Sequence, residues 1–235
     1  MILLDNIVSA FARNPEMHHY PVKHVIIDEF VPVAVVKRCQ ADIARDRGKW
    51  VSYNNDSEKK ITCNDASAFS GDIASILELM QSRAFANDLS QLFDISPLQA
   101  DPLLHGGGIH ISSNGGLLNI HLDYSKHPRL PLLERRINCI LYLIPEWQES
   151  WGGATVLTEP DGVTVISRIY PAPGRLLIFE TNDLSYHGVE PVSCPNGTER
   201  ITLATYYLSH IRPGVTRERA LFVPPRTHRI KGAPN

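Results

Sequence analysis

The sequence lacks the features that mark membrane, secreted and nucleic-acid-binding proteins. No apolar run is long enough to span a bilayer, and the apolar opening (residues 1–11) is interrupted by Asp5 and Asn6 and has no basic segment, so we do not expect a signal peptide. Neither sign of charge dominates, because 23 Lys and Arg stand against 25 Asp and Glu, a formal net charge of −2. We therefore expect neither nucleic acid nor a membrane as a partner.

The sequence also has few cysteines, and none of them forms a CxxC pair. The four are scattered along the chain at Cys39, Cys63, Cys139 and Cys194. In a chain of this length, this spacing argues against a disulfide framework or a zinc site and indicates free thiols. It points to a cytoplasmic location.

No repeat, low-complexity tract or charged linker divides the 235 residues, so we expect one domain over 1–235. The first part, about residues 1–100, is predicted to be a helical support. After a strand-like stretch at 23–30, residues 33–47 carry apolar side chains at helical spacing and end at Gly48. Residues 72–93 show a second helical pattern, with apolar side chains recurring on one face.

Short β-rich runs separated by turn residues occupy about residues 105–210. Strands are predicted at 108–113, 117–124, 136–144, 153–158, 163–170, 175–180 and 200–209. Many short strands after a helical layer indicate a mainly β fold, a β-sandwich or jelly roll braced by helices. Residues 211–235, which are basic and rich in proline, are predicted to be an irregular tail over the body.

The segment LLNIHLD (residues 117–123) carries the first candidate chemistry. Alternation along a strand places Asn119, His121 and Asp123 on one face, opposite a face of Leu and Ile. An H-x-D pair alone fits a solvated strand face as well as it fits a site. His187 supplies a third candidate ligand, and two histidines with one carboxylate form the facial triad of non-haem Fe(II) enzymes. Zinc uses the same ligands, so they do not choose the metal.

Two further side chains fit a pocket next to such a metal. Arg200 shares one face of its strand with Thr202 and Ala204, and an inward arginine is costly unless it meets an anion such as a dicarboxylate. Tyr142 shares a face with Asn138 and could donate a hydrogen bond to the same carboxylate. Taken singly, an ion-paired surface arginine and a core tyrosine are the ordinary alternatives.

In order, HLD, RINCILYLI, WGG, PGRLLIFETNDLSYHGVEP and RITLATYY resemble the catalytic core of the prolyl 4-hydroxylase branch of the Fe(II)/2-oxoglutarate-dependent dioxygenases. The resemblance covers roughly residues 105–209 and implies a double-stranded β-helix. It implies that Fe(II) is bound by His121, Asp123 and His187. It also implies that 2-oxoglutarate is held by Arg200, with Tyr142 assisting and Thr202 beside them. His110 stands near the place where the family often has a tyrosine, either as a polar wall of the pocket or as a plain strand histidine.

The reaction implied by the resemblance consumes O2 and 2-oxoglutarate, hydroxylates an unactivated C–H bond and releases succinate and CO2. A small residue replaces the carboxylate ligand in related halogenases, so Asp123 favours hydroxylation.

The substrate is the least determined part of the prediction. The basic run at 124–136 is predicted to be a loop over the pocket mouth, or simply a solvated loop. Candidate substrate contacts are Asn119, Tyr124, Lys126, Arg129 and Arg136. They would suit a small, anionic molecule or a glycan precursor, and peptidyl proline is the alternative. A non-catalytic ligand-binding jelly roll and a zinc hydrolase are rival interpretations. The N-terminal helices and the tail are two surfaces that could serve a homodimer.

Overall fold

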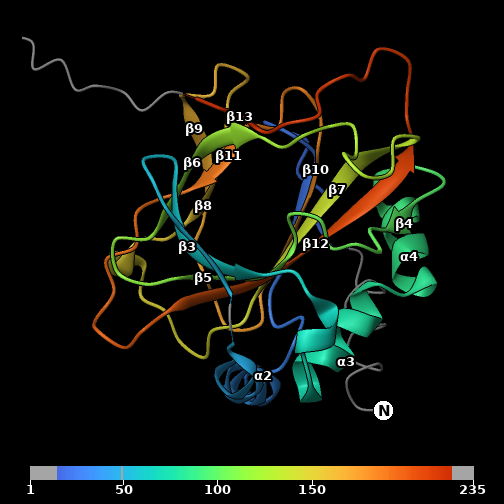
Figure 1. The fold of residues 1–235 in the computed structure, drawn as a ribbon. Helices are drawn as coiled ribbons and strands as arrows, with labels where there is room; N and C mark the ends of the chain where they lie inside the picture. Colours follow the sequence, from blue (N-terminus) through green and yellow to red (C-terminus); the bar gives the residue numbers. More distant parts are fainter. Residues whose placement is uncertain (1–14, 49, 224–235) are drawn as a thin grey trace, which may run out of the picture.

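The strands of this chain form one curled antiparallel sheet, and the helices lie outside it (Figure 1). The structure is a computed structural model that describes residues 15–48 and 50–223. The strands are β1 (His24–Ile27), β2 (Val51–Asn54), β3 (Glu58–Cys63), β4 (Gln99–Ala100), β5 (Gly108–Ser112), β6 (Leu117–Leu122), β7 (Leu133–Tyr142), β8 (Thr155–Thr158), β9 (Val165–Ile169), β10 (Leu176–Glu180), β11 (His187–Val189), β12 (Arg200–His210) and β13 (Leu221–Phe222). The helices are α2 (Val33–Asp46), α3 (Gly71–Met80) and α4 (Arg83–Phe93), with short 3-10 turns at Ala66–Ala68 and Glu149–Trp151.

The strand order explains how the sheet closes around a site. It runs β1-β10-β7-β12-β5-β3-β6-β11-β8-β9, with β13 paired to β6, β2 to β3 and β4 to β12. β3 joins the two halves, because it pairs with β5 at one end and with β6 at the other. The curl makes a half-barrel of the double-stranded β-helix type, which confirms the predicted fold class.

The two long central strands separate the core from the interior of the curl. Along β12, Leu203 and Tyr207 belong to the hydrophobic core, whereas the alternate residues Arg200 and Thr202 face the interior. Cys139 on β7 lies in the same core. The period of two therefore gives one apolar face for the helices and one polar face for chemistry.

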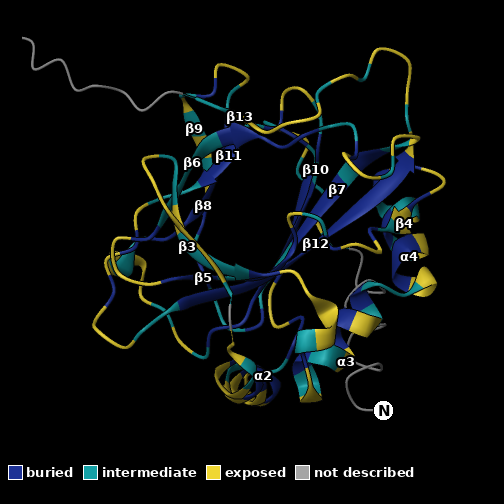
Figure 2. Cartoon of the chain, in the orientation of Figure 1, coloured by how far each residue is buried: buried dark blue, intermediate teal, exposed yellow. Residues whose placement is uncertain are grey.

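The helices cover the outer face of the sheet, with their buried sides turned inward (Figure 2). α2 matches the helix predicted at 33–47. The pattern at 72–93 forms two helices, not one, because Ser82 starts α4 as its N-cap and its hydroxyl accepts the Phe85 amide at 3.2 Å. Both helices keep the apolar face that the sequence predicts.

Two short strand features supplement the helical support and the tail that the sequence predicts. The N-terminal part is not only helical, because it contains the β2–β3 hairpin, whose turn is closed by the Asn55 side chain accepting the Ser57 and Glu58 amides. The tail is not only irregular, because Leu221–Phe222 forms β13. Residues 1–11, which are predicted not to be a signal peptide, and residues 224–235 of the tail lie outside the described residues.

All four cysteines are buried free thiols, as predicted. Over the part of the chain that the structure describes, no helix has the length and apolar character needed to cross a membrane.

Tyr207 links the sheet to the helical layer. Its buried hydroxyl donates to the carbonyl of Met80 at the end of α3, and its ring stacks on Phe85 with centroids 5.8 Å apart. We expect Tyr207→Phe to lower the free energy of unfolding by about 1–2 kcal/mol, because the Met80 carbonyl loses a buried partner. Urea denaturation measures the change. Tyr53→Phe, at a tyrosine that is 38% exposed, is the control, and equal effects of the two variants would contradict this role.

Candidate active site

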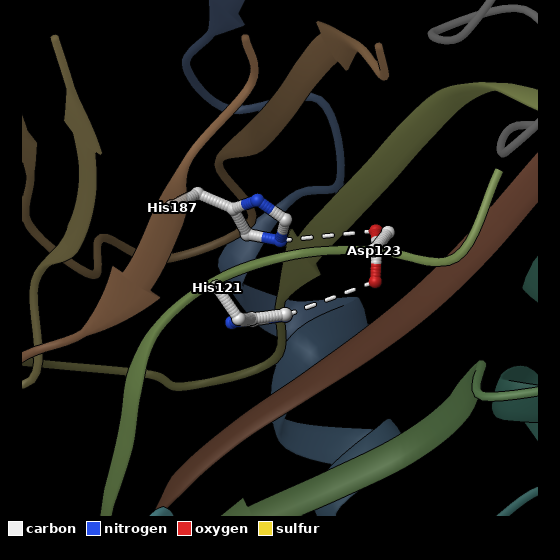
Figure 3. Close-up of side chains that lie close together, drawn as sticks. All are labelled: His121, Asp123 and His187. Atoms are coloured by element: carbon white, nitrogen blue, oxygen red, sulfur yellow. Dashed lines mark ion pairs between the residues drawn. The ribbon is translucent and has the colours of Figure 1, made fainter. Parts of the chain in front are cut away.

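Two neighbouring strands bring the three predicted metal ligands together. His187 on β11 lies directly opposite His121 on β6, and Asp123 follows the end of β6. Their ligand atoms all lie within 4.8 Å of one another, and all three residues are buried. The Nε2 atoms of His121 and His187 are 3.7 and 3.8 Å from the two carboxylate oxygens of Asp123 (Figure 3).

A β-bulge in β6 changes which of its residues face the interior. His187 pairs with His121, but Val189 pairs with Leu118, so the register shifts between the two pairs. Leu118 consequently lines the same cavity as His121. Asn119 does not line it; its side-chain amide donates to the carbonyl of Asp56 at 2.9 Å. The expectation that Asn119 contacts the substrate rested on unbroken alternation, which the bulge removes.

Both histidines are oriented by backbone carbonyls. Nδ1 of His121 lies 2.9 Å from the carbonyl oxygen of Asn119, and Nδ1 of His187 lies 2.9 Å from that of Ser185. Nδ1–H is therefore the donor in each ring, and the Nε2 lone pair is left for a metal. Burial, with His121 close by, lowers the pKa of His187 to about 4, which keeps its imidazole neutral at physiological pH.

Asp123 is held by Arg135, which the sequence does not single out as a site residue. Nη1 of Arg135 lies 2.9 Å from Oδ1 of Asp123, and its guanidinium sits between the rings of Tyr124 and Tyr206, 3.7 and 3.2 Å from their centroids. Burial would raise the pKa of Asp123, but Arg135 and the two histidines outweigh it and hold that pKa below its usual range.

The other oxygen of this carboxylate, Oδ2, is buried and has no hydrogen-bond partner among the described residues. A buried unpaired carboxylate oxygen close to the Nε2 lone pair of His187 is unfavourable unless a cation sits among the three side chains. The donor set of two nitrogens and one oxygen fits Fe(II) and leaves further coordination positions open.

A cavity of about 360 Å³ extends from the triad along the interior face of β12. Arg200 lies in its wall and is only 3% exposed. Its Nε donates to the carbonyl of Gly153 at 2.7 Å, and Nη2 donates to the hydroxyl of Thr155 at 2.9 Å. No carboxylate of the described chain forms an ion pair with it. Burial lowers the pKa of Arg200, as expected for a cation whose counter-ion is not part of the protein.

Tyr142 stands behind this arginine and not at the cavity surface. It is fully buried, and its hydroxyl lies 2.6 Å from that of Thr155 and donates to the carbonyl of Ile169 at 3.2 Å. A chain of hydrogen bonds thus runs from Arg200 through Thr155 to Tyr142. From this position, Tyr142 can orient the hydroxyl of Thr155, whereas the sequence suggests that it contacts the anion directly.

The remaining predicted cofactor residues line the cavity. Thr202 and His110 face each other across β12 and β5. Burial, aided by Lys60, lowers the pKa of His110 to about 3, so its imidazole is neutral at physiological pH. Lys60 also lines the cavity, from the hairpin that the sequence did not reveal.

Three basic side chains of the predicted loop at 124–136 do not line the cavity. Lys126 forms an ion pair with Glu218 at 2.6 Å, and Arg136 lies 3.4 Å from Glu180. Neither of these residues, nor the exposed Arg129, lines the cavity, whereas Tyr124 does. Acidic residues distant in sequence pair with Lys126 and Arg136, and the role of all three basic residues in substrate contact stays a prediction.

Two further residues that line the cavity could have been predicted from the alternation along their strands. Tyr206 continues the face of Arg200 and Thr202, and Asn138 lies on the interior face of β7. Thr155 comes from a separate strand, and nothing in its local sequence marks it.

Comparisons with known proteins place this geometry in context. Residues 107–208 match the model of the 2OG-Fe(II) oxygenase superfamily. A prolyl 3-hydroxylase of Mus musculus, OGFOD1, is 30% identical over 95 residues, which cover 39% of this chain but only 17% of that protein. A prolyl-4-hydroxylase of Pseudomonas putida has a similar fold, with a TM-score of 0.59 and 18% identity over 93% of this chain and 100% of the other. A viral collagen prolyl hydroxylase of Paramecium Bursaria Chlorella virus-1, in complex with 2OG, also has a similar fold. Its TM-score is 0.53 and its sequence identity is 17%, over 79% of this chain and 96% of the other.

The triad predicts direct metal binding. We expect Co(II), a spectroscopic substitute for Fe(II), to bind at one per chain and to raise the melting temperature. His187→Ala should weaken this binding at least about 100-fold, because one of three protein ligands is lost. Titration followed by Co(II) absorption measures it. His210→Ala, at an exposed histidine, is the matched control, and equal affinity of the two variants would exclude the triad as the site.

Proposed function

Because this chain belongs to the 2OG-Fe(II) oxygenase superfamily, we propose that it is a hydroxylase that oxidises a C–H bond of a prolyl residue in a peptide or protein. The observation that carries the oxygenase chemistry is the presence, in one cavity, of a buried metal triad and a buried arginine without a carboxylate partner. Bound Fe(II) and 2-oxoglutarate would supply the oxidising chemistry, in which O2 is consumed and succinate, CO2 and the hydroxylated product are released.

The protein's own residues would bind and orient the cosubstrate. In the proposal, the guanidinium of Arg200 pairs with the distal carboxylate of 2-oxoglutarate, and Thr202 lies beside it. Tyr142 acts through Thr155, whose hydroxyl also accepts a hydrogen bond from Arg200. His110, neutral and partly buried, would form part of the polar wall without adding charge. This division leaves the triad end of the cavity for the substrate.

Two observations support a prolyl substrate. The relatives named above are prolyl hydroxylases that act at different ring carbons, so their names support the residue type and not the position. The walls near the triad include the aromatic residues Tyr124, Tyr206 and Phe222, which suit packing of a small, apolar ring. Of the basic side chains that would have favoured an anionic metabolite, Lys126 and Arg136 are paired elsewhere, and Arg129 is exposed and does not line the cavity.

A small molecule or glycan precursor is the second candidate, and the size of the cavity favours it. A volume of about 360 Å³ is near the lower end for small-ligand pockets, and part of it would hold 2-oxoglutarate. A non-catalytic ligand-binding role is disfavoured by the intact triad.

Cosubstrate binding gives a prediction for Arg200. We expect anaerobic Fe(II) and 2-oxoglutarate to produce a weak visible charge-transfer band with the wild type. Arg200→Met should raise the dissociation constant of the cosubstrate at least about 30-fold, about 2 kcal/mol, because the anion loses its buried counter-ion. The band, titrated with 2-oxoglutarate, measures this, and Co(II) affinity should stay within about twofold. Arg168→Met, at a half-exposed arginine, is the control; unchanged binding in Arg200→Met would contradict the role.

The substrate class is tested by product formation. Proline-containing peptides, free proline and phosphorylated sugars are incubated with Fe(II), 2-oxoglutarate and O2, and succinate is compared with the background without substrate. We expect only prolyl peptides to raise succinate and to gain the mass of one inserted oxygen atom. Hydroxylation of a free metabolite with no effect of peptides would favour the second candidate, and an absence of succinate above background with every substrate would contradict both.

A further inference from the structure

Residues 212–223, called here the strap, cross over β6, the strand that carries His121 and leads into Asp123. β13 pairs with β6 so that Leu221 lies opposite Leu122 and Phe222 lies opposite His121. The amide of Val223 then donates to the carbonyl of Ile120 at 2.8 Å. The strap lies outside the region matched by the superfamily model, which ends at residue 208.

Phe222 contacts a metal ligand directly. Its ring stacks on the imidazole of His121, with centroids 5.0 Å apart and an interplanar angle of 25°. On its other side, His121 meets His187 at 4.4 Å, and His187 in turn meets the buried ring of Phe179 at 4.8 Å. Phe222 is only half-buried, because it lines the cavity, and it is therefore the open end of a row of four rings.

Arg217 joins the two segments from which the ligands come. Its Nε donates to the carbonyl of Asp123 at 2.8 Å, and its guanidinium forms an ion pair with Asp183, in the loop that leads into His187. Its own carbonyl accepts the amides of Ser125 and Lys126 at 2.8 and 2.9 Å. One residue of the strap thus contacts the segments on both sides of the triad, through the backbone at Asp123 and through the side chain of Asp183.

We propose that the strap is part of the active site, in which Arg217 and Phe222 are positioning residues for the metal ligands and Phe222 is a wall of the substrate pocket. Phe222 limits rotation of the His121 ring, and Arg217 holds the Asp123 backbone against the loop before His187. The half-buried face of Phe222, with Ala220 beside it, is the apolar surface on which the substrate ring packs. Only this last role rests on the proposed function.

The positioning role is tested with Co(II) and without any substrate. We expect Phe222→Ala and Arg217→Ala each to weaken Co(II) binding about 10-fold, in the range seen when groups that orient metal ligands are removed. The Co(II) absorption spectrum should also change, because the ligand geometry relaxes. Phe222→Leu, which keeps an apolar side chain of similar reach, should recover most of the affinity.

Neighbouring residues of the strap supply matched controls. Leu221 is adjacent to Phe222 but 52% exposed, and Arg219 carries the same charge as Arg217 on an exposed position. Leu221→Ala and Arg219→Ala should bind Co(II) within about twofold of the wild type and give its spectrum. Melting temperatures without metal separate a loss of folding from a loss of positioning. Wild-type affinity and spectrum in both Phe222→Ala and Arg217→Ala would overturn the positioning role.

The wall role is tested with a prolyl peptide. We expect Phe222→Ala to raise the Michaelis constant for the peptide about 5- to 10-fold and to increase the succinate formed per hydroxylated product. The Michaelis constant for the cosubstrate should stay within about twofold. Equal Michaelis constants for the peptide in Phe222→Ala and Leu221→Ala would overturn the wall. If the wild type hydroxylates no prolyl peptide, the proposed function and this wall fail together, whereas the Co(II) measurements still decide whether the strap positions the ligands.

Discussion

The ion pair between Asp123 and Arg135 is the interaction on which the site depends. A buried carboxylate and a buried guanidinium are each costly alone, and the rings of Tyr124 and Tyr206 on either side hold the arginine in place. Arg135 pairs with Oδ1, which also lies near His121, and this leaves Oδ2 unpaired and 3.8 Å from Nε2 of His187. The orientation of the carboxylate is thus set by the protein before any metal binds, which lowers the cost of ordering it on binding.

The second buried arginine differs from the first in one decisive respect. Arg135 has an acidic partner, but Arg200 donates to the neutral oxygens of Gly153 and Thr155 and forms no ion pair with a carboxylate of residues 15–48 or 50–223. Two guanidinium groups in one cavity would disfavour binding of a metal cation unless an anionic group neutralised the charge nearest the metal ligands. Arg135 is neutralised beside the metal ligands, and in the proposed function Arg200 pairs with the anionic cosubstrate in the same cavity.

The sequence predicted the metal ligands and the curl of the sheet through two signals, strand alternation and the order of the family motifs. Alternation placed His121 with Asp123 on one strand face and Arg200 with Thr202 on another, whereas His187 and the β-helix followed from the resemblance. Alternation failed at Asn119, where a bulge depends on pairing with another strand. Alternation also did not identify Thr155 and Arg135 as site residues, because their roles depend on contacts with residues far apart in sequence. For the same reason, the charge of the 124–136 run did not indicate that Lys126 and Arg136 pair with Glu218 and Glu180, which are distant in sequence.

The cavity is assembled from segments with different relationships to the superfamily. The triad and Arg200 lie within residues 107–208, which match the family model. Tyr53 and Lys60 come from the β2–β3 hairpin, and Ala220 and Phe222 come from the strap; all four line the cavity but lie outside that region. Chemistry that needs only a metal and a dicarboxylate can be supplied by the shared region. Selection of the substrate requires contacts that differ between members, and the walls added by the hairpin and the strap are where such differences can arise without disturbing the metal ligands.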